Sequence, residues 1–391
     1  MKKILFVTTT YILKNSSAAI RNNSLVKGLI DLGYDVDVCS VEWPHSLSSP
    51  FFAREKNGNI HLDQLPNLMR IAKFKQSQIQ KKDNKWISRI RQILKKILFF
   101  PDECYEWKEI FNCENLGQYA CLISSSDHKT SHFVGLKVKR QCPSLPWIQI
   151  WGDPWGSDVN TPLLMKPITS YYEKKILKVA DKIVYVSSVT RQELQKKYSR
   201  LADKMYYVPR GYYFKIPASS LDRDHIRIVY TGVLSSGRNP FILLNALLKL
   251  KIPTSRLTVE FYGGVPSDIQ ERLKKYPFVE LHESVDFEYM PNILASASML
   301  LYLSNKKGSS QIPGKLFDYM GTSKPVLCLV SDTTEPISLF LKRFERCIVL
   351  DNDETVILNS WNRIEEACGN DFVPEENFSP KFIASQIIKL L

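Results

Sequence analysis

Two short runs of apolar, β-branched residues constrain the fold most, because each opens a block of alternating strand and helix signals. Lys3 to Thr8 (KILFVT) starts the first block, and Ile226 to Thr231 (IRIVYT) starts the second. Continuous apolar strands are typical of parallel sheets that are buried on both faces. A parallel sheet needs crossover helices, and each block supplies them. The 391 residues therefore predict two doubly wound, Rossmann-like α/β domains.

In the first block, one strand–helix–strand unit can be read completely. A helical pattern follows the first strand, ends at Gly33, and leads into a strand at Asp35–Cys39. Further buried strands are expected at Ala120–Ser124, Trp147–Ile150 and Lys182–Val186. In the second block we expect strands at Leu257–Tyr262, Val279–His282, Met299–Leu303 and Pro325–Val330, and helices at Pro240–Leu250, Ser267–Lys275, Pro291–Ala297 and Pro313–Met320.

The two blocks are separated by a stretch rich in Pro, Gly and Ser, from Pro209 to Asp224. We therefore place an N-terminal domain at 1–212 and a C-terminal domain at 213–391. The last residues, Pro380–Leu391, have the pattern of an amphipathic helix. The sequence leaves open whether this helix returns to the first domain.

Composition narrows the class of protein. Hydrophobic residues make up 44% of the chain and charged residues 24%, which is typical of a globular protein. The net charge of +13 favours phosphorylated ligands, anionic membranes or nucleic acids as partners. The 8 cysteines form no CxxC pair, so neither a disulfide framework nor a zinc site is expected. The opening apolar run is too short for a signal peptide, and no apolar stretch reaches about 18 residues, so we expect a cytoplasmic protein.

The most informative segment runs from Gly308 to Met320, after the strand that ends at Leu303. Its small polar residues expose backbone N–H groups and Pro313 opens a helix, which is typical of an anion site. Lys315 lies in the first turn, where a cation does not stabilise the helix but could face a phosphate. Asp318 lies one turn further on the same face and could bind both ribose hydroxyls. A solvated surface pair is the alternative.

A second candidate segment, Thr231 to Pro240, follows the first strand of the second block. Gly232 and Gly237 let the backbone approach a ligand. Arg238 comes just before a helix and could fork onto a diphosphate. The alternative is an ordinary β–α turn with an exposed Arg. The segment has no G-x-G-x-x-G pattern, which argues against a dinucleotide site.

Together these segments resemble the GT-B glycosyltransferases, especially glycosyltransferase family 4 and its bacterial surface-polysaccharide members. The resemblance covers most of the chain, and IPGKLFDYMGTSKPVL is its most specific part. Its other carriers are KKILFVTTTY, Arg21 with GYDVDV, FFPDECYEW, PWIQIWGDPW, DKIVYVSSVTRQEL, YYVPRGY and IVYTGVLSSGRNP. It implies two facing domains, with a nucleotide-sugar donor on the C-terminal one and the acceptor on the N-terminal one. It implies Asp318 on the donor ribose, and basic residues on the diphosphate. The candidate donor-binding residues are Gly232, Arg238, Ser309, Ser310, Ile312, Lys315 and Asp318.

Two positions depart from the family pattern. Many members carry two glutamates separated by seven residues, where this chain has Ser310 and Asp318. Many also carry a His soon after a strand of the first domain. Simple alignment puts Ser125 at that position, with His128 and His132 nearby. We take His128 as a candidate catalytic residue, and a structural histidine is the alternative.

Asp153 lies between two tryptophans, just after the strand that ends at Ile150. A carboxylate at a strand end could bind acceptor hydroxyls or act as a base. A turn Asp that caps the next segment is the alternative. Arg21, together with Ser17 in the polar stretch before it, is a candidate for contact with the acceptor or with phosphate.

Two D-x-D patterns raise the possibility of a metal-dependent transferase of the GT-A type, at Asp35–Asp37 and at Asp351–Asp353. The first alternates with valines in a short strand, and the second lies in an acidic tail. Two alternating blocks also disfavour GT-A, which is usually one domain. We predict no metal, and no cofactor apart from the nucleotide sugar as co-substrate.

The segment Lys81–Phe100 has the pattern of a basic amphipathic helix. Apolar residues, with Trp86 among them, recur at helical spacing, and Lys and Arg fill much of the rest. This pattern favours contact with an anionic membrane surface. A packed helix with a solvated basic face is the alternative. Nucleic acid is not expected as a partner, because no nucleic-acid-binding module is recognisable.

These features lead us to expect a metal-independent glycosyltransferase that acts on a lipid-linked or saccharide acceptor. The resemblance alone implies a role in capsule, O-antigen or exopolysaccharide assembly, at the inner face of the plasma membrane. Two alternatives stay open. One is a nucleotide-sugar epimerase of the same fold. The other is an inactive scaffold, which the missing glutamate at Ser310 would favour.

Overall fold

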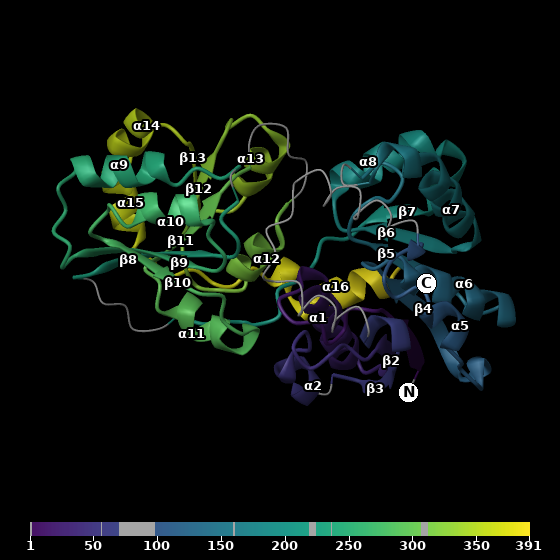
Figure 1. The fold of residues 1–391 in the computed structure, drawn as a ribbon. Coiled ribbons are helices and arrows are strands. Elements are labelled where there is room, and N and C mark those ends of the chain that lie inside the picture. The colour runs from purple at the N-terminus through teal and green to yellow at the C-terminus, as the bar shows by residue number, and fades with distance from the viewer. Residues whose placement is uncertain are drawn as a thin grey trace. The chain divides into compact units, whose positions relative to one another are not determined.

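The computed structural model describes residues 2–55, 57–69, 98–158, 161–218, 224–235, 237–305 and 312–391. Within it the chain forms two compact units (Figure 1). The N-terminal unit consists of Met1–Gly211 and Pro380–Leu391, and the C-terminal unit is Tyr212–Ser379. The last segment thus belongs to the N-terminal unit, a possibility that the sequence left open.

The N-terminal unit is built on a 7-stranded sheet whose strand pairs are all parallel. Its spatial order is β3-β2-β1-β4-β5-β6-β7. The strands are β1 (Lys3–Val7), β2 (Asp35–Val41), β3 (Asn59–Asp63), β4 (Tyr119–Ser125), β5 (Trp147–Trp151), β6 (Lys182–Tyr185) and β7 (Met205–Tyr207). The described helices are α1 (Ser17–Asp31), α2 (Pro50–Glu55), α5 (Trp107–Ile110), α6 (Thr130–Gln141), α7 (Lys166–Val179), α8 (Ser188–Lys197) and α16 (Pro380–Ile388), with 3-10 turns η1 (Leu116–Gln118), η2 (Leu163–Met165) and η3 (Ser199–Lys204).

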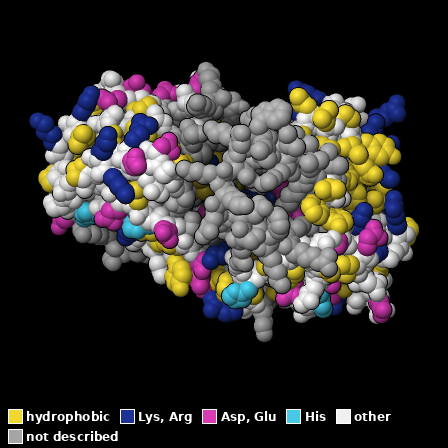
Figure 2. Space-filling model, viewed as in Figure 1, with side chains coloured by type: hydrophobic (Ala, Val, Ile, Leu, Met, Phe, Trp, Pro, Cys, Tyr) yellow, Lys and Arg dark blue, Asp and Glu magenta, His cyan; other side chains and the backbone are white. Residues whose placement is uncertain are grey.

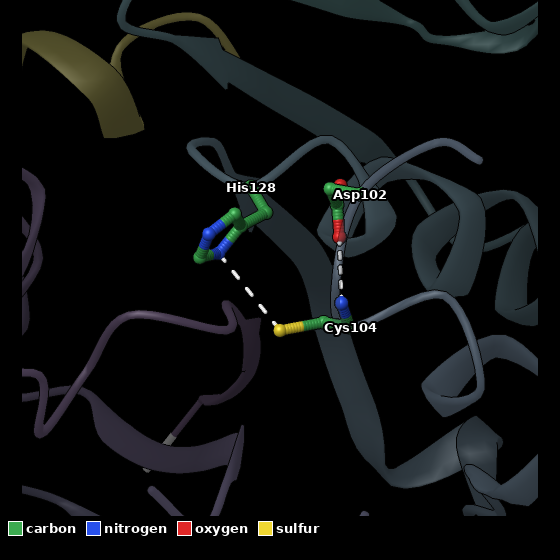
Figure 3. A group of neighbouring side chains, drawn as sticks. All are labelled: Asp102, Cys104 and His128. Carbon is green, nitrogen blue, oxygen red and sulfur yellow. Dashed lines mark hydrogen bonds between the residues drawn. The ribbon is translucent and has the colours of Figure 1, made fainter. Parts of the chain in front are cut away.

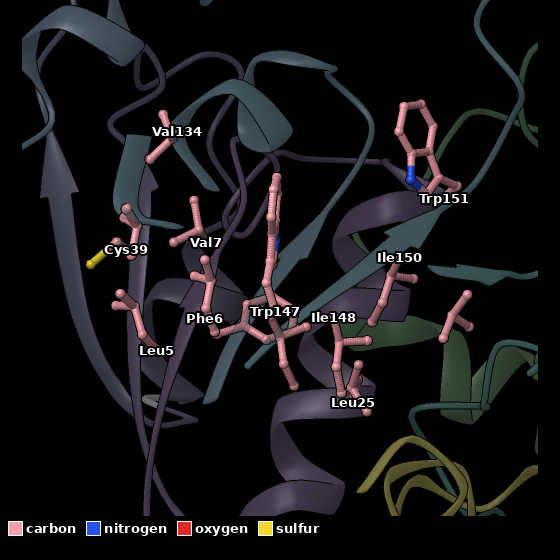
Figure 4. Close-up of a cluster of buried hydrophobic side chains, with 14 of the residues drawn as sticks. Leu5, Phe6, Val7, Leu25, Cys39, Val134, Trp147, Ile148, Ile150 and Trp151 are labelled. Carbon is pink, nitrogen blue, oxygen red and sulfur yellow. The ribbon is translucent and has the colours of Figure 1, made fainter. Parts of the chain in front are cut away.

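The core of this unit explains why its first strand is continuously apolar. Leu5, Phe6 and Val7 are all fully buried, although neighbouring side chains point to opposite faces of the sheet. Both faces must therefore be covered. Figure 4 shows these side chains beside Leu25 of α1 and Trp147 of β5, within one buried cluster.

The C-terminal unit repeats this plan on a 6-stranded parallel sheet of order β10-β9-β8-β11-β12-β13. The strands are β8 (Ile226–Thr231), β9 (Leu257–Tyr262), β10 (Val279–His282), β11 (Met299–Leu303), β12 (Val326–Val330) and β13 (Cys347–Asp351). The helices are α9 (Phe241–Lys249), α10 (Ser267–Leu273), α11 (Met290–Ala295), α12 (Gly314–Met320), α13 (Pro336–Leu341), α14 (Glu354–Asn359) and α15 (Trp361–Ala367), with 3-10 turns η4 (Phe287–Tyr289) and η5 (Glu376–Phe378).

Alternate residues of these strands enter two separate cores. Ile228 and Leu301 pack in one cluster, and Val229 and Leu300 pack in the other. Helices therefore cover both faces, as the continuous apolar strands predict. The stretch described above as an acidic tail is also part of the fold. It continues from the end of β13 into α14 and α15, and Asp353 caps α14 by accepting the N–H of Val356 at 3.0 Å.

The strands predicted from the sequence are present, with ends that differ by at most a few residues. The sequence reading did not name three strands and eight helices of the described residues, namely β3, β7, β13, α2, α5, α6, α7, α8, α13, α14 and α15. No helix among the described residues is long and apolar enough to cross a bilayer. Most of the predicted basic helix, residues 81–97 of Lys81–Phe100, lies outside the described residues.

The return of α16 to the N-terminal unit has a local cause in α1. Gly28 has no side chain, and a Cβ at this position would overlap the carbonyl oxygen of Pro380 and lie 2.9 Å from the Cβ of Ala384. The glycine therefore lets α16 pack closely on α1. Ile383 and Ile387 of α16 complete the contact by entering the core of this unit.

Candidate active site

The strand orders locate one crevice in each unit. In an open parallel sheet, ligands bind beyond the carboxyl ends of the strands where the strand order reverses. That point lies between β1 and β4 in the N-terminal unit, and between β8 and β11 in the C-terminal unit. The predicted segments after Thr231 and after Ser125 begin at these two points.

In the C-terminal unit, Lys315 reaches back from α12 to the end of β8. Its ammonium group donates to the carbonyl oxygen of Thr231 and lies 3.7 Å from the centre of the Tyr230 ring. Burial lowers the pKa of Lys315 well below its ordinary value, and the nearby charge of Arg238 acts in the same direction. The ammonium group of Lys315 therefore lies in a poorly solvated position.

Arg238 contacts the same tyrosine through its hydroxyl group. Its Nη1 donates to the hydroxyl of Tyr230 at 3.0 Å and to the carbonyl oxygen of Val233 at 2.7 Å, while its buried Nε has no hydrogen-bond partner in the described part of the chain. Among the described residues, neither Arg238 nor Lys315 forms an ion pair with a carboxylate. Two adjacent cations without a counter-ion favour the binding of an anion.

The backbone around these cations is shaped by glycine and tyrosine. Gly232 has a φ of +96°, and a Cβ there would lie 3.4 Å from the ammonium nitrogen of Lys315. Tyr319 ties α12 to the end of β8, because its hydroxyl accepts the N–H of Thr231 at 3.1 Å. The position of Lys315 therefore follows from a buried contact between two elements.

Only some of the other predicted donor residues lie among the described residues. Asp318 is half-buried on α12, one turn after Lys315, and Ile312 packs against the core beside this helix. Ser309 and Ser310 lie outside the described residues. The structure thus brings Gly232, Arg238 and Lys315 together, with Asp318 on the same helix as Lys315.

In the N-terminal unit, Arg21 is buried at the carboxyl end of β4. Its Nη2 donates to the hydroxyl of Ser125 at 3.2 Å and to the carbonyl oxygen of Ser126, while its Nε has no hydrogen-bond partner among the residues that the structure describes. Burial lowers the pKa of Arg21 to about 10. The guanidinium fits because residue 152 is a glycine, since a Cβ on Gly152 would lie 2.8 Å from Nη1.

Two carboxyl groups beside Arg21 have opposite electrostatic surroundings. Burial raises the pKa of Asp153, and the negative charge of Asp127 raises it further. Burial also acts to raise the pKa of Asp127, but the ammonium group of Lys129 and the charge of Arg21 outweigh it and leave the pKa below its ordinary value. Lys129 bridges the two loops, because it pairs with Asp127 and donates to the carbonyl oxygen of Asp153 at 2.8 Å.

His128 lies next to this group and is half-buried. Its Nδ1 is 3.2 Å from the hydroxyl of Thr9, and its Nε2 is 3.8 Å from a carboxylate oxygen of Glu103. The ring stacks on Trp43 with centroids 5.6 Å apart. In contrast, His132 is fully buried and stacks on a tryptophan of β5. Its Nδ1 shares a hydrogen bond of 2.8 Å with the hydroxyl of Ser124. The alternative of a structural histidine therefore fits His132 better than His128.

His128 also approaches Cys104 and Asp102, and Figure 3 shows the three side chains facing one another. Their ligand atoms lie within 4.8 Å of one another. However, Asp102 already accepts hydrogen bonds from the N–H of Cys104 and from both the N–H and the hydroxyl of Thr130. Burial raises the pKa of Cys104 well above its ordinary value, whereas a metal requires a thiolate. The group therefore holds the start of α6 in place.

The two D-x-D patterns have structural partners as well. Asp37 accepts from the hydroxyl of Tyr119 at 2.6 Å and pairs with Lys3 at 2.8 Å. Asp351 accepts the N–H of Thr333 at 3.0 Å. Asp37 and Asp351 are thus each bonded within their own unit.

A pocket of about 350 Å³ opens beside His128 within the N-terminal unit. Its walls are mainly aromatic and aliphatic, with several carboxylates among them. The lining residues are Phe99, Phe100, Pro101, Asp102, Glu103, His128, Trp155, Asp158, Thr161, Pro162, Met165 and Thr169. Aromatic faces beside carboxylates are suited to the apolar faces and hydroxyls of a sugar.

Ser17, the other acceptor-side candidate, contacts Arg210. It is exposed at the start of α1, where its hydroxyl accepts a hydrogen bond at 2.9 Å from Nη1 of Arg210. The charge of Arg210 also lowers the pKa of Arg21, so the two guanidinium groups are neighbours. The sequence reading assigned no role to Arg210, Lys129 or Asp127, although Arg210 lies in the quoted segment YYVPRGY.

Comparisons with known proteins identify the architecture. No protein-family model matches the sequence, and no curated protein matches it. Among solved structures, the chain is similar to Alr3699/HepE of Anabaena in complex with UDP and glucose, with a TM-score of 0.60 and 12% identity over 100% of this chain and 98% of that one. This is the GT-B fold.

Other GT-B structures resemble the chain to a similar degree. A UDP-GlcNAc 2-epimerase from Neisseria meningitidis bound to UDP-GlcNAc is 14% identical, with a TM-score of 0.56 over 99% of each chain. TarM is 9% identical, with a TM-score of 0.58 over 100% of this chain and 98% of that one. The predicted fold class is thereby confirmed, and membership of glycosyltransferase family 4 stays a prediction.

Proposed function

We propose that this GT-B protein transfers a sugar from a nucleotide-sugar donor to a hydroxyl group of an acceptor. One observation carries the proposal. Arg238 and Lys315 meet at the carboxyl end of β8, next to the same tyrosine ring, and neither is paired with a carboxylate among the described residues. A diphosphate is the ligand that two such cations would hold best.

On the donor side, these cations would stabilise the negative charge of the departing nucleoside diphosphate. Asp318, one turn along α12 from Lys315, would bind the ribose hydroxyls. Solved neighbours of this fold are complexes with UDP and with UDP-GlcNAc. A uridine nucleotide is therefore the first donor to test.

On the acceptor side, the aromatic pocket beside His128 would hold a sugar. The acceptor oxygen forms a bond to the anomeric carbon of the donor, and the bond from that carbon to the diphosphate breaks. Asp153 would accept the proton of the acceptor hydroxyl, since a raised pKa suits a general base. Arg21 and Lys129 would hold Asp153 and Asp127 in place.

We further propose that the acceptor is a lipid-linked glycan of bacterial polysaccharide assembly, such as capsule or lipopolysaccharide. This proposal rests on the resemblance to glycosyltransferase family 4. It also agrees with the basic pattern of Lys81–Phe100, which would bring the protein to the inner face of the plasma membrane.

A second candidate function is epimerisation of the nucleotide sugar itself. It is favoured by the similarity to UDP-GlcNAc 2-epimerases, whose TM-scores are 0.55 and 0.56. Incubation with UDP-GlcNAc in the absence of an acceptor separates the two functions. An epimerase converts the sugar under these conditions, whereas a transferase releases UDP quickly only when an acceptor is added.

Calorimetry with UDP and with uridine tests the donor site. We expect Arg238→Ala and Lys315→Ala to weaken UDP binding by about 1.5–3 kcal/mol each, the range for hydrogen bonds to charged groups, and to change uridine binding little. We expect Asp318→Ala to weaken the binding of UDP and of uridine equally, because both ligands carry the ribose. Lys249→Ala is the control, since this lysine pairs with Glu354 on the surface. Equal losses of UDP and uridine in the Arg238 and Lys315 variants would contradict the proposal.

A further inference from the structure

The turn η2 and the helix α7 expose an unusual apolar surface in the N-terminal unit. Leu163 is 81% exposed and Leu164 is 85% exposed. One helical face continues the surface through Ile168 and Tyr171, which are 43% and 62% exposed. The opposite face carries Ile176 and other buried residues, so α7 already has its contact with the core. The exposed apolar residues are additional to that contact and mark a binding surface.

The same outward face becomes basic further along α7. Lys174, Lys175 and Lys178 are exposed there, and Lys166 lies near the apolar end. The apolar residues and the lysines recur at three- and four-residue spacing, so they form one stripe along the helix. Figure 2 shows hydrophobic side chains with Lys and Arg around them over the part of the unit where Figure 1 places α7.

No acidic side chain of α7 offsets this charge. Its single carboxylate, Glu173, is fully buried and accepts hydrogen bonds from the N–H groups of Trp155 and Gly156 and from the hydroxyl of Tyr198. It also pairs with Lys197. The outer face is therefore apolar at one end and cationic at the other.

The apolar end adjoins the pocket beside His128. Pro162 and Met165 line that pocket, and the two exposed leucines lie between them in the chain. Leu98 is 72% exposed and directly precedes two phenylalanines that line the same pocket. Apolar surface thus extends from the pocket wall to the outside of the unit.

We propose that this face, named here the η2–α7 face, docks the protein on an anionic lipid bilayer. Leu163 and Leu164 enter the acyl boundary, and Lys174, Lys175 and Lys178 contact the anionic headgroups. A second copy of the chain fits this surface less well, because the lysines would face a protein whose own net charge is +13. Docking would place the pocket at the bilayer surface, where the lipid-linked acceptor of the proposed function would lie; this last step alone rests on that proposal.

Sedimentation with vesicles tests the proposal independently of enzyme activity. The full chain is mixed with vesicles of equal parts phosphatidylglycerol and phosphatidylcholine, or of phosphatidylcholine alone. We expect it to bind only the anionic vesicles, and more weakly at high salt because the attraction is screened. Absence of binding to the anionic vesicles at low salt would overturn the proposal.

Matched variants locate the binding surface. We expect Lys174→Gln with Lys175→Gln and Lys178→Gln to reduce binding about a hundredfold at low salt, since each lysine near an anionic surface contributes about fivefold. The control replaces Lys251, Lys274 and Lys275 with Gln, which changes the net charge equally on the exposed surface of the C-terminal unit. Equal losses in both variants would show a general charge effect and overturn the proposal.

The apolar end is tested by Leu163→Glu with Leu164→Glu, which should weaken binding to anionic vesicles at least tenfold. The control, Leu339→Glu with Val373→Glu, changes two exposed apolar residues of the C-terminal unit and should bind normally.

A Leu164→Trp variant gives a direct readout, because lipids brominated on their acyl chains should quench its added fluorescence. Unchanged binding of the Glu variant would assign the bilayer contact to another segment. Light scattering that shows a dimer broken by the same variant would assign the face to a second copy.

Discussion

Asp127 and Asp153 share the carboxyl end of one sheet with Arg21 and Lys129, and the charges of these two cations act on the pKa values of both carboxyl groups. Burial acts to raise the pKa of both carboxyl groups. It prevails at Asp153, but the ammonium group of Lys129 outweighs it at Asp127. Two carboxyl groups whose pKa values are driven apart are typical of acid–base sites.

This pair gives a pH prediction. The charge of Asp127 raises the pKa of Asp153, so Asp127→Asn should lower that pKa and move the acid limb of the rate profile to lower pH. Asp153→Asn should reduce kcat by about 10²–10⁴, the usual range for loss of a general base. Rates of sugar transfer measured across pH check both results. Asp203→Asn is the control, because this carboxylate is exposed on η3. An acid limb that stays in place in Asp127→Asn would exclude Asp153 as the group that titrates.

At the scale of elements, the close packing of α16 on α1 depends on the absence of one side chain. Gly28→Ala would place a Cβ against the carbonyl group of Pro380, and rigid backbone cannot yield as a flexible side chain does. Tyr319 fixes α12 on β8 in a comparable way, through the N–H of Thr231. Contacts of this kind position the cations and helices that the proposed function needs.

We expect Gly28→Ala to lower the free energy of unfolding of the N-terminal unit by about 1–3 kcal/mol, the range for overpacking in a core. Denaturant unfolding followed by circular dichroism measures this change. Gly117→Ala serves as the matched control, because a Cβ at Gly117 would meet nothing within 4 Å. If both variants unfold at the same denaturant concentration, α16 is not held by close packing on α1.

At the scale of the whole molecule, the two units differ in how the chain builds them. Tyr212–Ser379 is continuous and has buried clusters on both faces of its sheet. The N-terminal unit needs a segment from each end of the chain. We therefore expect a fragment of residues 212–379 to fold alone and to prefer UDP over uridine, since Arg238 and Lys315 both lie within it.

Calorimetric unfolding and UDP titration of this fragment check the expectation. A single cooperative transition together with the diphosphate preference is the expected result. A fragment that unfolds without a cooperative transition would show that its two clusters do not suffice for stability.

Much of this organisation could be predicted from local sequence patterns. The apolar strands and the turn residues after them predicted the strand–helix alternation, and hence the ends of β4 and β8 as sites. Lys315 was predicted because it lies in the first turn of a predicted helix, and Arg238 because it comes just before one. Arg210 was not, because its neighbour Arg21 is far away in the sequence and only the fold brings them together. The amphipathic pattern of α16 predicted that it packs, but a pattern does not name the partner.

The origin of α16 at the far end of the chain also has a consequence for synthesis in the cell. The face of α1 that receives α16 is made before Tyr212–Ser379, and α16 is made after it. At roughly 5–20 residues per second, the ribosome takes on the order of ten to thirty seconds to pass through the intervening unit. During that time the nascent N-terminal unit exposes an apolar surface that chaperones can recognise. A premature stop just before Pro380 would therefore damage a unit that was translated long before it.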